Sequence, residues 1–233
     1  MKNQNVFKRY EIKYLITKEE KEELLNLMKL YMHEDDYGKS TICNIYFDTP
    51  DSLLIRRSLE KPIYKEKFRV RSYGVANDDS KVFVEIKKKY KSVVYKRRVS
   101  LTQCEAMSYI CDGVFPSKRN QITDEIDYFL SLYKDLIPKV FLSYEREALY
   151  SKTDSDFRIT FDENILWRDY DLSLCKGVYG DSILQKDMVL MEIKTANAIP
   201  IWMANFLSAH KIYKTSFSKY GNAYLKLLLL KGA

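Results

Sequence analysis

The sequence predicts an α+β fold with a mostly antiparallel sheet. Many segments alternate between apolar and charged residues with the period of two that is typical of β-strands. Helical segments interrupt these strands without the regular strand–helix alternation that indicates a parallel sheet. The chain contains no low-complexity linker and no shift in composition, so we expect one domain over residues 1–233.

The first half of the chain is expected to be rich in strands. Thr17 and Glu20 have the spacing of a capping box, which indicates that a helix begins directly after the first strand. The expected elements, in order, are a strand over 10–16, a helix to about Met32, a strand over 41–47, a short helix through Arg57 whose cap is a Thr or an Asp of 48–51, and three strands over 64–74, 81–90 and 92–101.

The second half begins with helices and returns to strands. A second capping box, Thr102 with Glu105, starts a helix that ends near Gly113. The remaining expected elements are a helix over 122–136 closed by Pro138, strands over 139–147, 156–163 and 188–194, a helical region over 200–210 and a last helix after Ser218.

The segment Tyr64–Gly74, YKEKFRVRSYG, has an unusual row of cations. Neighbouring strand residues point to opposite faces of a sheet, so Phe68 and Val70 lie on one face. The other face carries Lys65, Lys67, Arg69 and Arg71. Four cations in a line raise the question of which anion they meet.

Several other strands also place charged or polar residues on one face. These sets are Glu11 and Lys13; Glu85, Lys87 and Lys89; Lys96 and Arg98; Tyr144 and Arg146; Arg158, Thr160 and Asp162; and Glu192 and Lys194. Ordinary sheets with one apolar and one solvated face would show this pattern. A closed barrel with helices outside and cations inside would show it too, and buried cations would then need a counter-ion, a metal or water.

Composition favours an anionic partner. Lys and Arg exceed Asp and Glu by 39 to 32, which gives a formal charge of +7. The four cysteines are scattered without a CxxC pair, so neither a zinc site nor a disulfide framework is indicated. There is no signal-peptide pattern and no apolar run long enough for a membrane span. We therefore expect a cytoplasmic protein, located at the inner face of a membrane only through a separate membrane protein as its partner.

Several short motifs follow one another along the chain: RYEIKYLI at Arg9, NIYFDT at Asn44, FRVRSYG at Phe68, VEIKKK at Val84, YKRRVSL at Tyr95, SYERE at Ser143, FRITFDENI at Phe157, MEIKT at Met191 and SFSKYGNAY at Ser216. Taken in this order, they resemble the VTC domain, the polyphosphate polymerase module of the vacuolar transporter chaperone complex. This domain is a member of the triphosphate tunnel metalloenzymes and is related to the CYTH proteins. The resemblance covers nearly the whole chain.

The resemblance implies a closed antiparallel barrel, or tunnel, of about eight strands with helices packed outside. Its basic inner face would hold a nucleoside triphosphate and a growing phosphate chain. The residues implied to be catalytic or to bind the reacting phosphates are Lys13, Arg69, Arg71, Lys87, Arg146, Arg158 and Lys219. Lys96 or Arg98, Tyr144, Lys194 and Ser218 are implied as further contacts to the ATP.

Glu192 is the metal ligand that the resemblance implies, with Glu11 as a second. Only Glu11 precedes Lys13 where the wider superfamily has the acidic ExExK signature. This shortage of acid favours a polymerase that needs one Mn²⁺ or Mg²⁺ over a two-metal hydrolase. Such an ion takes oxygen ligands and bridges phosphates.

The implied activity is that of an ATP:polyphosphate phosphotransferase of the polyphosphate kinase type. It would transfer the γ-phosphoryl group of ATP to the end of the chain and release ADP, by positioning and charge stabilisation. A triphosphatase of the same fold and a non-catalytic module that binds polyphosphate remain alternatives. A nucleic-acid-binding protein is disfavoured because neither a recognition helix nor a stacking platform is evident.

Overall fold

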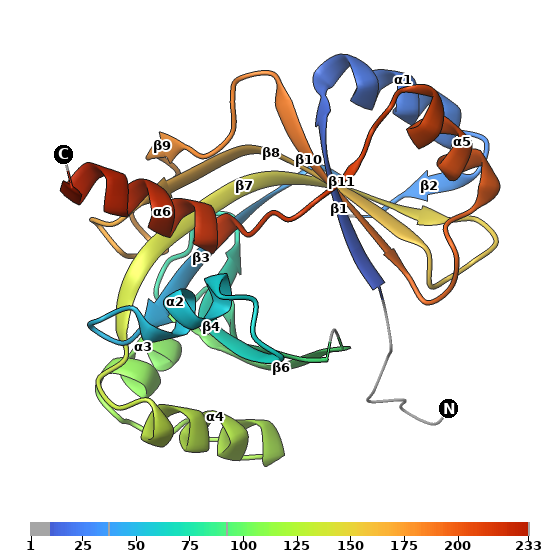
Figure 1. The fold of residues 1–233 in the computed structure, drawn as a ribbon. Coiled ribbons are helices and arrows are strands. Elements are labelled where there is room, and N and C mark those ends of the chain that lie inside the picture. The colour runs from blue at the N-terminus through green and yellow to red at the C-terminus, as the bar shows by residue number, and fades with distance from the viewer. Residues whose placement is uncertain (1–9, 37, 92, 233) are drawn as a thin grey trace. The chain divides into compact units, whose positions relative to one another are not determined.

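The computed structural model describes residues 10–36, 38–91 and 93–232, which form eleven strands and six helices (Figure 1). They group into two compact units. Unit 1 comprises the described parts of Met1–Thr41, Tyr144–Ile165 and Leu184–Phe217, and unit 2 those of Ile42–Ser143, Leu166–Ile183 and Ser218–Ala233. The expectation of one domain stays a prediction.

Unit 1 is built on an antiparallel sheet with the strand order β11-β1-β10-β8-β7. Its strands and helices are β1 (Tyr10–Thr17), α1 (Lys18–Met28), β2 (Met32–Glu34), the C-terminal part of β7 (Ile137–Ser151), most of β8 (Arg158–Arg168), β10 (Met188–Thr195), α5 (Ile201–Ala209) and β11 (Lys214–Thr215). The short strand β2 pairs with β7.

The apolar face of this sheet is covered by α1 and α5, which lie close together in Figure 1. Alternate residues of β8 and β10 are fully buried there, as the period of two predicts: Phe157 just before β8, and Ile159, Phe161, Val189, Met191 and Ile193. Leu24 and Met28 of α1 and Met203 of α5 pack against them. The charged alternates of the same strands are therefore directed to the other face.

Unit 2 contains the strand order β7-β3-β4-β5-β6. Its elements are β3 (Ser40–Asp48, from Ile42), α2 (Leu53–Leu59), β4 (Tyr64–Tyr73), β5 (Lys81–Tyr90), β6 (Val93–Thr102), α3 (Gln103–Cys111), α4 (Gln121–Leu132), the start of β7, the end of β8 with β9 (Asp181–Ser182), and α6 (Lys219–Gly232). The three expected strands β4, β5 and β6 pair in order as an antiparallel meander.

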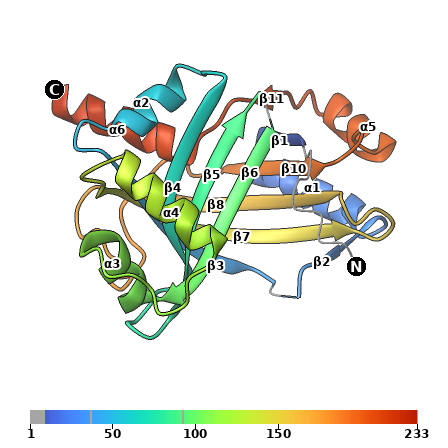
Figure 2. The ribbon, with the colours of Figure 1, turned by 90° about the horizontal axis from the view of Figure 1, so that it is seen from below.

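The core of unit 2 lies between this sheet and its helices. Phe68, Val70 and Ile86 are fully buried and pack with Ile126 and Phe129 of α4. Figure 2 shows α4 crossing β4, β5 and β6. The prediction that Phe68 and Val70 lie opposite the cation row of β4 is confirmed.

The expected α+β class with a large antiparallel sheet is confirmed, but closure into a barrel is not. The strand order begins at β11 and ends at β6, and no hydrogen-bonded pair within the described ranges joins these two strands. No helix in the described part of the chain is both long enough and apolar enough to span a membrane.

Both predicted capping boxes are present. Thr17 Oγ1 accepts from the amide of Glu20 at 3.1 Å, while the Glu20 carboxylate accepts from the amide of Thr17 at 2.7 Å. Thr102 and Glu105 are paired in the same way. The short helix α2 is also held by its upstream residues, because the Asp48 carboxylate accepts from the amide of Leu54 at 2.8 Å.

Two expected helix ends were wrong. The first helix ends at Met28 instead of Met32. The residues Met32–Glu34 form strand β2, which pairs with the end of β7, so they are not available to extend the helix. The helix expected over 122–136 ends at Leu132, since Tyr133 departs from helical geometry with a ψ of 77°. Pro138 lies inside β7, so it is a strand residue instead of the residue that closes the helix.

Candidate functional site

The polar face of unit 2 carries a row of lysines across three strands. Lys67 of β4 lies opposite Lys87 of β5, which lies opposite Lys96 of β6. Like charges directly opposite each other destabilise an antiparallel pair. An anion placed over this row would reduce the repulsion between the three ammonium groups.

Glu85 is the carboxylate at the centre of this face. Its side chain is only 1% exposed, and Oε2 is 2.8 Å from Arg69 Nε and 4.0 Å from Arg71 Nε. Lys96 Nζ is 2.6 Å from Oε1. Burial alone would raise the pKa of Glu85, but the charges of Arg69, Arg71 and Lys96 lower it to about 2. Glu85 is therefore a permanent anion that holds three cations in place.

Lys96 has an ammonium group that can titrate near neutral pH. Burial lowers its pKa to about 8, against the opposing effect of Glu85 and with a further lowering by Arg71. An anion bound beside it would raise this pKa again. Lys96 therefore couples the charge of the polar face to pH.

Two uncharged residues of β3 orient the arginine pair. Arg69 Nη1 donates to the hydroxyl of Tyr46 at 2.8 Å, and Arg71 Nε donates to Asn44 Oδ1 at 3.0 Å. Asn44 is itself fixed by a bond from Nδ2 to the carbonyl of Leu142 at 3.1 Å. The guanidinium groups are thus held from the side of β3 as well as by Glu85.

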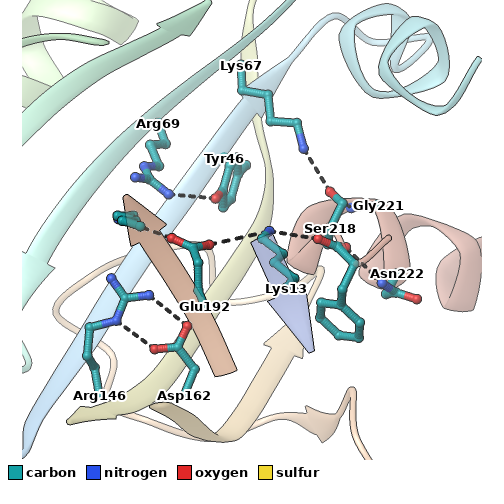
Figure 3. A network of polar contacts seen from close by, with 12 residues as sticks. Lys13, Tyr46, Lys67, Arg69, Arg146, Asp162, Glu192, Ser218, Gly221 and Asn222 are labelled. Atoms are coloured by element: carbon teal, nitrogen blue, oxygen red, sulfur yellow. Dashed lines mark hydrogen bonds and ion pairs between the residues drawn. The ribbon is translucent and has the colours of Figure 1, made fainter. Parts of the chain in front are cut away.

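The start of α6 contributes Ser218, which precedes Lys219, to the same unit. Lys67 Nζ donates to Ser218 Oγ at 2.8 Å, and the amide of Gly221 donates to the same oxygen at 3.1 Å (Figure 3). A Cβ on Gly221 would lie 3.1 Å from that oxygen, so glycine permits the close approach. Arg98, the remaining predicted contact, lies with its guanidinium carbon 4.4 Å from the ring centroid of Phe83.

In unit 1, β1 and β10 bring together four charged residues of alternating sign. Lys13 is opposite Glu192, and Glu11 is opposite Lys194. Glu192 Oε2 is 3.7 Å from Lys13 Nζ, and its Oε1 is 3.1 Å from Lys194 Nζ. Figure 3 shows Lys13 directed at Glu192; its ammonium also donates to the carbonyl of Phe217 at 2.7 Å.

Arg146 and Asp162 form a bidentate ion pair on the same unit. The Arg146 Nε–Asp162 Oδ1 distance is 2.6 Å and the Nη2–Oδ2 distance is 2.7 Å (Figure 3). Burial lowers the pKa of Arg146, but Tyr144, Asp162 and Glu192 outweigh it and raise that pKa well above its ordinary value. The guanidinium carbon lies 5.1 Å from the ring centroid of Tyr144. The predicted Tyr144–Arg146 pair thus forms one unit with a carboxylate.

The polar face of β8 carries Arg158 and Thr160. Arg158 Nη2 is 3.5 Å from Asp35 Oδ2, and the guanidinium carbon of Arg158 is 4.5 Å from the ring centroid of Tyr150. Thr160 is 1% exposed and lies opposite Glu192 in the β8–β10 register. Arg158 Nε and Thr160 Oγ1 are buried atoms without a hydrogen-bond partner among the described residues. Unsatisfied buried polar atoms are rare and call for an explanation.

The protein ligands for a metal are few. Within the described ranges, no group of three or more His, Cys, Asp or Glu side chains could hold an ion. Glu192 offers a carboxylate and Thr160, directly opposite, offers a neutral oxygen. Mg²⁺ and Mn²⁺ are commonly held by one or two protein oxygens together with substrate phosphates and water. The oxygen donors of unit 1 therefore fit a metal ion whose remaining ligands are supplied by a phosphate.

The predicted site residues fall into two sets. The set in unit 1 is Glu11, Lys13, Tyr144, Arg146, Arg158, Glu192 and Lys194, and the set in unit 2 is Arg69, Arg71, Lys87, Lys96, Arg98, Ser218 and Lys219. Sequence reasoning assigned no site role to Asn44, Tyr46, Glu85 or Asp162. Alternation placed Glu85 and Asp162 on the polar faces of their strands, but it does not give the partners of a side chain, and Asn44 and Tyr46 were expected only to lie in a strand.

A family model for the VTC domain matches residues 8–228. A comparison with curated proteins gave no match. The family that the sequence motifs indicated is therefore confirmed for nearly the whole chain.

Solved structures with a similar fold come from bacteria and a plant. A candidate adenylate cyclase from Bacillus halodurans is 14% identical, with a TM-score of 0.57 over 92% of this chain and 96% of that one. A second from Vibrio parahaemolyticus is 10% identical, with a TM-score of 0.50 over 94% and 99%. The candidate adenylyl cyclase HpAC1 from Hippeastrum, which has a dominant triphosphatase activity, is 14% identical, with a TM-score of 0.51 over 90% and 92%.

Proposed function

This chain belongs to the VTC domain family, and on that premise we propose that it is a metal-dependent phosphotransferase that extends polyphosphate with the γ-phosphoryl group of ATP. The proposal includes the predicted closed barrel, whose lumen would keep water away from the reacting phosphoryl group. This activity belongs to the wider class of enzymes that act on triphosphates.

The observation that supports a transferase over a hydrolase is that the carboxylates of the two polar faces are paired with cations. Glu85 contacts three cations, Asp162 is bound by Arg146, and Glu192 lies within 3.7 Å of a lysine on β1. These carboxylates balance and position cations instead of forming an acidic cluster for two metals. One carboxylate, Glu192, is then assigned to a single metal.

The cations supply the binding and the stabilisation that phosphoryl transfer requires. Arg69 and Arg71 present planar groups that grip phosphate oxygens in pairs, whereas Lys67, Lys87 and Lys96 act as point charges along a chain. Charge accumulates on the transferred group and on the ADP that leaves, and fixed cations stabilise both.

The polar residues of unit 1 are assigned to binding phosphate and the metal. Lys13 and Arg146 would bind phosphate oxygens, with Arg158 as a further ligand, and Glu192 would hold the ion. A bound Mn²⁺ or Mg²⁺ would neutralise phosphate charge and orient the γ-phosphoryl group. The terminal phosphate of the growing chain is the nucleophile in this proposal, so no protein nucleophile is required.

A triphosphatase is the second candidate, because HpAC1, which shares the fold, has that activity. The two reactions use the same binding groups and differ in whether phosphate or water attacks the γ-phosphorus. A non-catalytic polyphosphate-binding module would use the cations and would not need Glu192.

The test is to incubate the purified protein with ATP and Mn²⁺ and to follow phosphorus by ³¹P NMR. Growth of the internal-phosphate signal with release of ADP is the expected result. The Glu192→Ala variant should lose turnover, whereas Glu60→Ala, which alters an exposed carboxylate outside the site, should retain it. Orthophosphate as the main product would support the triphosphatase, and unchanged ATP with shifted resonances would support the binding module.

A further inference from the structure

Thr160 has a buried hydroxyl that the fold itself does not use. Its side chain lies on the polar face of β8, where it is 1% exposed, and its Oγ1 has no hydrogen-bond partner among the described residues. A threonine in a strand can be replaced by valine of the same shape, so an unsatisfied hydroxyl at this position costs stability without a gain in packing. The hydroxyl is more readily explained by a ligand than by the fold.

The neighbours of Thr160 define what that ligand is. Glu192 lies directly opposite on β10, and side chains at such positions have Cβ atoms about 4.5–5.5 Å apart. The Glu192 carboxylate contacts Lys13 and Lys194, and it is not a hydrogen-bond acceptor for Thr160. Asp162, two residues along β8, is held by Arg146. A carboxylate and a neutral hydroxyl oxygen thus lie side by side on neighbouring strands.

We propose that Thr160 Oγ1 is a ligand of the divalent cation bound by Glu192. The inference rests on the proposed function and adds a residue to its metal site. A hydroxyl is an accepted partner for such ions, as the Ser or Thr of the phosphate-binding loop of nucleotide hydrolases shows. The neutral oxygen adds a ligand without adding charge, which leaves the anionic ligands to be supplied by phosphate.

The test measures metal binding directly, without turnover. Free Mn²⁺ is titrated with protein and counted by its electron paramagnetic resonance signal, first with MnCl₂ alone and then with inorganic triphosphate added. Thr160→Val is expected to raise the Kd for Mn²⁺ by about tenfold, whereas Thr160→Ser should keep it within about threefold of the wild-type value because the hydroxyl is retained.

Ser143→Ala is the matched control. Ser143 also has a buried hydroxyl without a partner among the described residues, but it lies in unit 2. Its removal should leave the Kd for Mn²⁺ unchanged. The thermal midpoint of Thr160→Val should equal or exceed that of the wild type, since an unsatisfied polar atom is removed. A folded Thr160→Val variant with weakened Mn²⁺ binding supports the proposal.

Three results would overturn it. Equal Mn²⁺ affinity in Thr160→Val and the wild type would remove Thr160 from the site and leave the proposed function intact. If Thr160→Val weakens the binding of inorganic triphosphate in the presence of a chelator but leaves Mn²⁺ binding unchanged, Thr160 donates a hydrogen bond to phosphate instead of binding the metal. No Mn²⁺ binding by the wild-type protein, with or without triphosphate, would contradict the proposed function as well.

Discussion

Replacing Glu85 by glutamine tests whether a buried anion holds the cations of unit 2 in place. The carboxylate is 1% exposed and contacts Arg69, Arg71 and Lys96. Glutamine keeps the shape of the side chain and removes only its charge. The three cations are then left close together without the counter-charge, which is costly where water is largely excluded.

The pKa of Glu85 sets the size of the effect. A decrease from its ordinary value of 4.5 to about 2 corresponds to roughly 3 kcal/mol, at about 1.36 kcal/mol per pKa unit. Because the pKa is lower in the folded state, this contribution is present above pH 4.5 and is lost as the pH falls from about 4.5 to about 2. Glu85→Gln should therefore lower the free energy of unfolding by about 3 kcal/mol at pH 7 and by much less near pH 2.

The assay is urea unfolding at several pH values, followed by tryptophan fluorescence. Trp167 lies in unit 2 with Glu85, and Trp202 lies in unit 1, so a Trp202→Phe background makes the signal specific for unit 2. Glu125→Gln is the matched control, because Glu125 contacts one partly exposed arginine of β6. That control should cost less than about 1 kcal/mol. The reasoning is refuted if the two substitutions cost the same at pH 7.

Three further variants test other parts of the two polar faces. Asp162→Asn should lower the free energy of unfolding by about 3–5 kcal/mol in urea, because it leaves Arg146 buried without its counter-charge; an unchanged midpoint would contradict this. Binding of inorganic triphosphate, measured by calorimetry, should weaken as the pH rises through about 8, because Lys96 loses its proton. Lys96→Arg should remove this loss of affinity. Identical pH profiles for the variant and the wild type would exclude Lys96 as the group that titrates. Tyr46→Phe should weaken the same binding by up to about fivefold, since Arg69 loses one of the contacts that orient it; undiminished affinity would show that the hydroxyl is dispensable.

The polar faces could be predicted from the sequence because strand alternation is a local property. Phe68 and Val70 are buried and Arg69 lies on the other face, as the period of two in Tyr64–Gly74 indicated. The capping box of Thr17 with Glu20 could also be predicted, because its hydrogen bonds join residues that are three positions apart in the sequence.

Features that depend on distant partners could not be predicted in this way. The first helix ends at Met28 because the following residues pair with the end of β7, more than one hundred positions away. The helix before β7 ends at Leu132, although its apolar pattern continues to Leu136. In the first case, strand pairing with a distant segment competes with a helical pattern that is favourable on its own.

The sequence by itself determined the family, the α+β class and the face on which each charged side chain lies, since these depend on motifs and on local alternation. Only the tertiary structure decided that Glu85 meets Arg69, Arg71 and Lys96, and that Thr160 lies opposite Glu192. The physical reason is strand register, which is set by turns and by the packing of apolar faces between strands that can be far apart in the chain. Register selects the partner of each charge and thereby its pKa, its orientation and its part in the proposed chemistry.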